Sequence, residues 1–279
     1  MIVDAHLHFW RIDRGDYSWM DDSVAPIRRD VLPPEFDEIR ARLSISGSIV
    51  VQAAPTLAET EFLLGLADSN PSILGVVGWV DLGRPQAVAD VRRLARHPRF
   101  KGIRPMLQDI EETEWILRPE NMTTLRAVCV EGLRMDALVT PRHLPVIEIL
   151  ARKLPDLPMA IDHCGKPAIA GGNLPDQAWK DGMRRLSDFP QIYCKLSGLA
   201  TEFGTGWSAN ALAPVFQYVF DCFGSDRVLW GSDWPVLELV GRYDDWFRAV
   251  RTFSHGLSAG AEKNLWGGTA AAFYGLDET

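Results

Sequence analysis

Two histidines near the N-terminus form the first pattern in the chain that could do chemistry. His6 and His8 are separated by one residue at the end of a short apolar run. In a β-strand, residues two apart point to the same face. We therefore expect two imidazoles side by side, placed to bind a metal ion or to polarise a substrate carbonyl. Alone, the pattern is weak.

Two further motifs place a functional side chain directly after an apolar run. His163 follows one such run and is succeeded by Cys-Gly-Lys-Pro, and Asp233 follows another and is succeeded by Trp-Pro. A single Asp at a strand end most often forms a turn or caps a helix. However, three of the six histidines in the chain lie at such ends. If these ends meet in space, three imidazoles and one carboxylate form a candidate active site.

The elements that must position these residues alternate regularly along the chain. Eight short β-branched or apolar runs are found at residues 2–6, 47–52, 73–80, 101–105, 133–139, 158–163, 191–196 and 227–232. Amphipathic stretches lie between them, among others at 56–68, 85–96, 121–131, 144–153, 179–186 and 213–223. This alternation predicts βαβ units and a parallel sheet.

Eight such units favour a closed (β/α)₈ TIM barrel over a doubly wound sheet, and no GxGxxG motif follows the first strand. We expect residues 1–279 to form this barrel as a single domain. The first and last strands of a closed barrel are neighbours, so Asp233 should lie beside His6 and His8. His163 should face the same barrel mouth.

Composition excludes several classes of protein. The 279 residues are 47% hydrophobic and carry a net charge of −8, which argues against a nucleic-acid partner. No apolar run approaches the roughly 18 residues of a membrane helix, and no targeting signal begins the chain, so we expect a cytoplasmic protein. The four cysteines are far apart and are interpreted as free buried thiols. No sequence feature indicates an oligomeric state.

Two connecting segments are longer than the fold requires. Residues 9–32 carry Trp10, Tyr17 and Trp19 among polar residues, and residues 167–175 are rich in glycine. Long loops after barrel strands commonly build or cover an active site. The aromatic residues could also pin the first loop to the barrel rim, and the two interpretations are compatible.

These motifs together resemble the amidohydrolase superfamily, and within it the amidohydrolase-2 branch that includes sugar-lactone hydrolases. The resemblance covers nearly the whole chain. It is carried by the opening HxHFW, by DHCGKP around His163, by GSDWP around Asp233, and by the shorter segments VVQ, GWVDL, KGIR, CKLSG and LWGGTAA with a following FY.

The resemblance implies hydrolysis by a water molecule that Asp233 deprotonates. In metal-using members the strand-1 pair, here His6 and His8, and Asp233 are ligands. This chain departs from the binuclear pattern, because Arg104 stands where a bridging residue would be and strand 5 has no histidine. One divalent ion is therefore expected, zinc being favoured, on His6, His8, Asp233 and His163. In a metal-free alternative, the histidines polarise the carbonyl instead.

Five further residues are candidates at the barrel mouth. Arg104 presents a planar, permanently charged guanidinium suited to a carboxylate, a lactone oxygen or a developing oxyanion, or alternatively to a rim salt bridge. Gln52 could bind hydroxyl groups, and Trp10 and Trp79 could stack on a sugar-like ring, although core packing explains Trp79 equally well. Lys195 either points into the barrel to contact substrate or pairs outward.

The sparse positive charge indicates the kind of substrate. Several arginines would be expected around a polyanion, whereas this candidate site suits a neutral polyhydroxylated ring. The sequence thus predicts a hydrolase that opens a small-molecule sugar-acid lactone in carbohydrate catabolism. Alternatives are a metal-dependent decarboxylase, a lactone isomerase, or a barrel that binds a ligand without turnover.

Overall fold

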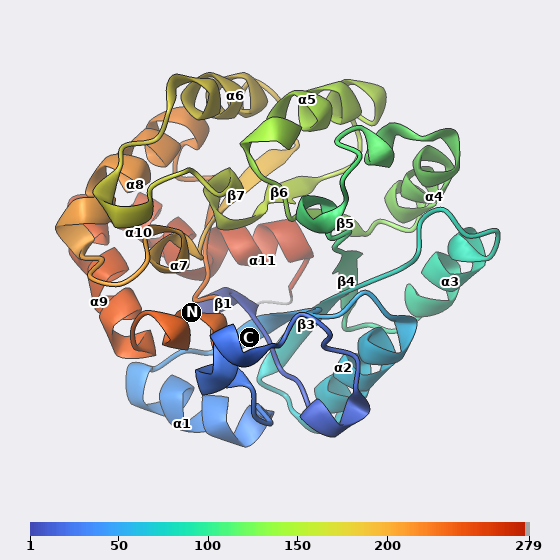
Figure 1. The fold of residues 1–279 in the computed structure, drawn as a ribbon, viewed down its shortest axis with the longest axis horizontal. Helices are drawn as coiled ribbons and strands as arrows, with labels where there is room; N and C mark the ends of the chain where they lie inside the picture. The colour runs from blue at the N-terminus through green and yellow to red at the C-terminus, as the bar shows by residue number, and fades with distance from the viewer. Residues whose placement is uncertain (277–279) are drawn as a thin grey trace.

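The computed structural model describes residues 1–276 and forms an eight-stranded parallel barrel. Its strands follow one another in sequence order from β1 to β8, as Figure 1 shows in a view along the barrel. The strands are β1 (Val3–Leu7), β2 (Gly47–Val51), β3 (Ile73–Gly78), β4 (Phe100–Ile103), β5 (Arg134–Ala137), β6 (Met159–Ile161), β7 (Ile192–Leu196) and β8 (Val228–Trp230). The predicted single-domain TIM barrel is confirmed.

Main-chain hydrogen bonds join the last strand to the first and close the barrel at its carboxyl end. Leu7 forms a parallel bridge with Trp234. The amide of Asp233 donates to the carbonyl of His6 (2.8 Å), and the amide of His8 donates to the carbonyl of Trp234 (2.8 Å). The seam therefore interleaves the residues of the first and third motifs, as the closed-barrel prediction requires.

Helices surround the strands (Figure 1). The main ones are α1 (Pro33–Leu43), α2 (Leu57–Ser69), α3 (Ala87–Leu94), α4 (Pro119–Val130), α5 (Leu144–Lys153), α6 (Gln177–Ser187), α8 (Ala209–Phe223) and α9 (Tyr243–Ser254). Shorter ones are α7 (Leu199–Phe203), α10 (Ala259–Lys263) and α11 (Thr269–Tyr274). Sequence explains where several begin: Thr56, Asp176 and Ser208 cap α2, α6 and α8 with their side chains.

The last helix closes the barrel at the end opposite the site. Phe273 and Tyr274 of α11 are buried against inward-facing strand residues such as Val3 and Val77. The preceding turn is equally tight, because a Cβ added to Gly267 would lie 2.8 Å from the carbonyl oxygen of Met1. The amino-terminal end of the barrel is thus filled, which leaves the carboxyl end for a ligand.

The strands end earlier than the sequence runs suggest. β6 stops at Ile161 and β8 at Trp230, so His163 and Asp233 lie beyond the strands, in turns with φ of 53° and 59°. The predicted runs 158–163 and 227–232 extended past the ends of these strands. The neighbouring residues are strand-like in type, so nothing in the sequence indicated that the backbone turns there. Among residues 1–276, no helix is long and apolar enough to span a membrane.

Candidate active site

A cavity of about 230 Å³ opens at the carboxyl ends of the strands. Its wall includes five residues that the sequence predicted for the site, namely His8, Trp10, Arg104, His163 and Asp233. The volume is somewhat below the range of about 300–1,000 Å³ that is usual for small-molecule sites. The cavity therefore fits one small ring rather than an extended ligand.

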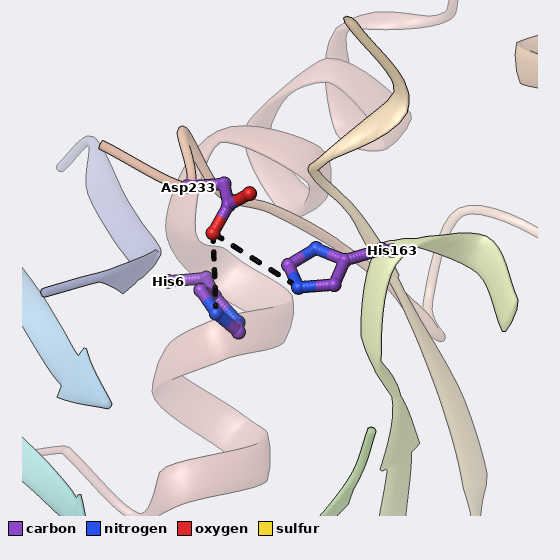
Figure 2. A group of neighbouring side chains, drawn as sticks. All are labelled: His6, His163 and Asp233. Carbon is purple, nitrogen blue, oxygen red and sulfur yellow. Dashed lines mark ion pairs between the residues drawn. The ribbon is translucent and has the colours of Figure 1, made fainter. Parts of the chain in front are cut away.

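Three imidazoles converge on one carboxylate oxygen. The Nε2 atoms of His8, His6 and His163 lie 3.2, 3.7 and 3.9 Å from Oδ1 of Asp233. Figure 2 shows His6, from β1, and His163, from the turn after β6, approaching this oxygen. All four side chains are almost completely buried. The structure thus brings together the four residues that the sequence proposed as a set.

The barrel seam positions His6 and Asp233. The buried carboxylate of Asp4 accepts hydrogen bonds from the amides of His6 (3.1 Å) and Ser232 (2.9 Å) and from the hydroxyl of Tyr243 (2.7 Å). One side chain therefore braces both chain segments that carry the site. Burial raises the pKa of Asp4 to about 6 despite these bonds.

The position of His163 depends on two neighbours that directly follow β7. Its Nδ1 lies 3.0 Å from Oγ of Ser197, which directs Nε2 toward Asp233. Gly198 passes so close that an added Cβ would lie 2.6 Å from Cγ of the imidazole, and its own φ is +66°. Ser197 and Gly198 together determine where the ring lies.

The hydrogen bond of His8 indicates what the site can hold. Its Nδ1 lies 2.8 Å from the carbonyl oxygen of Val51, which can only accept, so Nδ1 carries a proton. In a neutral ring, Nε2 is then a lone pair facing Oδ1 of Asp233 at 3.2 Å. Two acceptors this close need a positive centre between them, either a proton or a metal ion. The donor set fits a divalent ion.

Three ligand atoms are already grouped for such an ion. The candidate ligand atoms of His6, His163 and Asp233 lie within 4.8 Å of one another. Imidazole nitrogens with one carboxylate oxygen are ligands that zinc commonly takes. An ion bound by Nε2 of His6 would compete with Arg104 for this nitrogen, because Nη1 of Arg104 lies 3.3 Å from it.

Protonation states also suit metal binding and base catalysis. Burial lowers the pKa of His163 to about 4, and burial with the nearby Lys195 ammonium lowers that of His6 well below its usual value. Burial alone would raise the pKa of Asp233, but the surrounding histidines hold it below its usual range. At neutral pH the site contains neutral His6 and His163 and an ionised carboxylate.

Arg104 enters the cavity from beyond β4 and is held by Gln52. Its Nη2 donates to the main-chain oxygen of Gln52 and lies 3.3 Å from Oε1 of that side chain, which in turn donates to the carbonyl of Arg104 (2.9 Å). The buried Nε–H of Arg104 has no hydrogen-bond partner among residues 1–276. Arg104 thus has a donor to spare, and Gln52 supports it instead of lining the cavity.

Lys195 points into the barrel but lies beneath the cavity. Its ammonium pairs with Asp136 and lies 3.2 Å from both Oδ1 of Asp162 and Nδ1 of His6. The hydroxyl of Tyr274 donates to the same Asp136 (2.8 Å). Lys195 is fully buried and absent from the cavity wall, so the structure places it in a buried ion network, and the substrate contact stays a prediction.

The predicted aromatic contacts separate into two groups. Trp10 and Trp19 line the cavity, and their indole N–H groups donate to Arg29 and Ala53 (both 2.8 Å). The long loop after β1 therefore both covers the site and is pinned to the rim. Trp79, one residue beyond β3, does not line the cavity, and its main chain is held by the hydroxyl of Thr60.

Sequence reasoning overlooked part of the cavity wall. Gln108 and Asp109 line it from a single-turn helix, Leu107–Asp109, that follows β4, and Met106 lines it from the position just before this helix. Lys166 was not overlooked, since it belongs to the Cys-Gly-Lys-Pro motif; it lines the cavity as well, and its ammonium is paired with Glu202 at 3.2 Å. The position of Gln108 and Asp109, shortly after a strand, was a usable signal, because polar residues after barrel strands face the mouth.

Comparison with known proteins places the chain among enzymes of this fold. The family model Amidohydro_2, described as amidohydrolase, matches residues 3–276. An L-fucono-1,5-lactonase of Burkholderia ambifaria is 40% identical over 99% of this chain and 96% of its own length. One of the same name from Burkholderia multivorans is 35% identical over 99% of this chain and 96% of its own length.

A solved structure agrees over the same extent. It is an amidohydrolase from Burkholderia multivorans with bound zinc, which is 33% identical to this chain and superposes with a TM-score of 0.94. The alignment covers 99% of this chain and all of the other. The chain therefore belongs to the amidohydrolase family.

Proposed function

We propose that the protein hydrolyses an aldono-1,5-lactone, such as L-fucono-1,5-lactone, to the open-chain sugar acid. The observation that carries this proposal is the convergence of three imidazoles on one ionised carboxylate in a small cavity. The names of the relatives that match the whole chain support the substrate class. No observation favours the decarboxylase, isomerase or binding-module alternatives.

The residues perform the reaction as follows. Asp233 takes a proton from water as that water attacks the lactone carbonyl carbon. The spare donor of Arg104 stabilises the oxyanion that forms. When the ring C–O bond breaks, the carboxyl of Asp233 or the imidazole of His163 returns the proton to the leaving alkoxide. The net change is addition of one water molecule.

We also propose one resident divalent ion, zinc, on His6, His8, His163 and Asp233. The neutral state of His6 and His163, the lone pair of His8 and the anionic Asp233 support this donor set. When bound, such an ion supplies Lewis acidity and lowers the pKa of a coordinated water molecule. A cytoplasmic location and a place in carbohydrate catabolism remain predictions.

The proposal is tested with a panel of aldono- and uronolactones in weakly buffered solution containing a pH indicator. Ring opening at neutral pH releases acid, so turnover is seen as a colour change above the spontaneous rate. We expect six-membered aldonolactones to be hydrolysed at saturable rates. Failure to accelerate any lactone in the panel, by protein shown to be folded, would overturn the proposal.

A further inference from the structure

The charged side chains on the cavity wall are not equally paired within the protein. Each of its two permanent cations already faces a carboxylate outside the wall: Nη1 of Arg104 lies 3.5 Å from Oδ2 of Asp162, and Lys166 is paired with Glu202. Asp109 adds a second carboxylate to the wall, besides that of Asp233. The wall thus offers an anionic substituent little compensation.

Two polar side chains on the wall are unused within the protein. Among residues 1–276, the side chains of Gln108 and Asp109 form no hydrogen bond or ion pair. Both belong to the single-turn helix after β4, so they enter the cavity from the same side as Arg104. Their carboxylate and carboxamide groups are the kinds that accept and donate hydrogen bonds to vicinal hydroxyls.

The segment that carries these side chains is held in place. The amide of Gln108 donates to the carbonyl of Leu138 beyond β5 (3.1 Å). The guanidinium of Arg142 donates to the carbonyls of Ile110 (2.6 Å) and Glu111 (2.8 Å) immediately downstream. Because the segment is anchored on both sides, the helix holds Asp109 at a defined position. A fixed position is a condition for a side chain to select between substrates.

We propose that Asp109, assisted by Gln108, is the specificity determinant of the site. It binds ring hydroxyls of a neutral lactone and repels lactones that bear a free carboxylate. The inference rests on the proposed lactone hydrolysis for the location of the site, and it assigns the substrate selectivity of that site to one side chain. Since Asp109 does not touch the four residues at Asp233, it acts on binding and not on the chemical step.

Asp109→Asn is the main test, measured on three lactones: an aldono-1,5-lactone, unsubstituted δ-valerolactone and a uronolactone carrying a carboxylate. A hydrogen bond to a charged group predicts a KM about 10- to 100-fold higher for the hydroxylated lactone, at nearly unchanged kcat. For δ-valerolactone, kcat/KM should stay within about twofold, since there is no hydroxyl to lose. The uronolactone should improve relative to the other two.

Glu111→Gln is the matched control, because it removes one negative charge from the same loop outside the cavity wall. It should leave all three lactones unaffected. If Asp109→Asn changes δ-valerolactone as much as the hydroxylated lactone, or changes neither, the proposal is overturned. Asp109→Ala repeats the test with the amide removed, and thermal unfolding verifies that each variant is folded.

A binding measurement separates this inference from the reaction itself. A polyhydroxylated lactam, the amide analogue of the lactone, is titrated into wild type and Asp109→Asn by calorimetry. Weaker binding by about 10-fold or more in the variant supports the role of Asp109 even if no lactone is turned over. Equal binding to both proteins refutes it even if wild type proves to be an efficient lactonase.

Discussion

Replacing Gly198 by alanine tests whether the position of His163 controls activity. A Cβ at residue 198 would lie 2.6 Å from Cγ and 2.9 Å from Cβ of His163, whereas ordinary contacts begin at 3.4 Å. The added Cβ would lie closest to Nδ1 of the imidazole, so the ring would have to move by about 1 Å to restore an ordinary contact. This displacement stretches the bond to Ser197 and takes Nε2 away from Oδ1 of Asp233.

The expected effect is large on catalysis and moderate on stability. A misplacement of about 1 Å can cost about 100-fold in rate, so we expect kcat/KM for the aldonolactone to fall about 100-fold. That loss corresponds to about 2.7 kcal/mol of transition-state stabilisation. The left-handed backbone at residue 198 adds about 1–2 kcal/mol of destabilisation for alanine.

Gly204→Ala is the control for the backbone cost alone. Gly204 also has a left-handed φ, +86°, and an added Cβ there meets nothing within 4 Å among the described residues. This variant should lose stability but keep its activity. The argument is refuted if Gly198→Ala retains activity comparable to that of Gly204→Ala, because the clash with His163 would then have no catalytic consequence.

Three further variants test the proposed roles. Asp233→Asn should lower kcat about 1,000-fold. The melting temperature should hardly change, because asparagine tolerates the φ of 59° at this position. Elemental analysis should show less bound metal, and a full metal content would remove the carboxylate from the ligand set. Lys195→Met removes the ammonium that pairs with Asp136 and Asp162, so the free energy of unfolding measured in urea should fall by about 3–5 kcal/mol. If only KM changed, the substrate-contact interpretation of Lys195 would be favoured instead. Burial raises the pKa of Glu59 to about 7 from 4.5, so the native state binds the extra proton and stability falls as pH rises from about 4.5 to 7. Between pH 5 and 8, the free energy of unfolding should therefore fall by about 2.5 kcal/mol less in Glu59→Gln than in wild type. Parallel curves of unfolding free energy against pH for the two proteins would contradict this prediction.

The fold and the central cluster could be predicted because each depends on local pattern and closure. Eight strand-like runs separated by amphipathic stretches favour a barrel whatever the loops contain. Once the barrel closes, the ends of β1, β6 and β8 must share one rim, so His6, His163 and Asp233 meet. No long-range contact had to be guessed individually.

The orientation of single side chains was not predictable in the same way. Lys195 lies on β7, and strand alternation alone left both directions open. What decides its direction is the pair of buried carboxylates from β5 and the end of β6, Asp136 and Asp162, which have in Lys195 their nearest cation. Gln52 is likewise determined by a partner, Arg104, that is 52 residues away.

The backbone around the cluster gives a physical reason to regard it as functional. Five non-glycine residues among those described have positive φ, and four of them, His163, Cys164, Lys166 and Asp233, follow β6 or β8 at the site. Such conformations each cost free energy and persist where surrounding structure holds them. The Asp4 brace and the contact with Gly198 are such restraints. A barrel selected for stability alone would not need strained turns after both β6 and β8, the turns that bring the imidazole of His163 to the carboxylate of Asp233. The strain is explained if the convergence itself is what the chain must maintain.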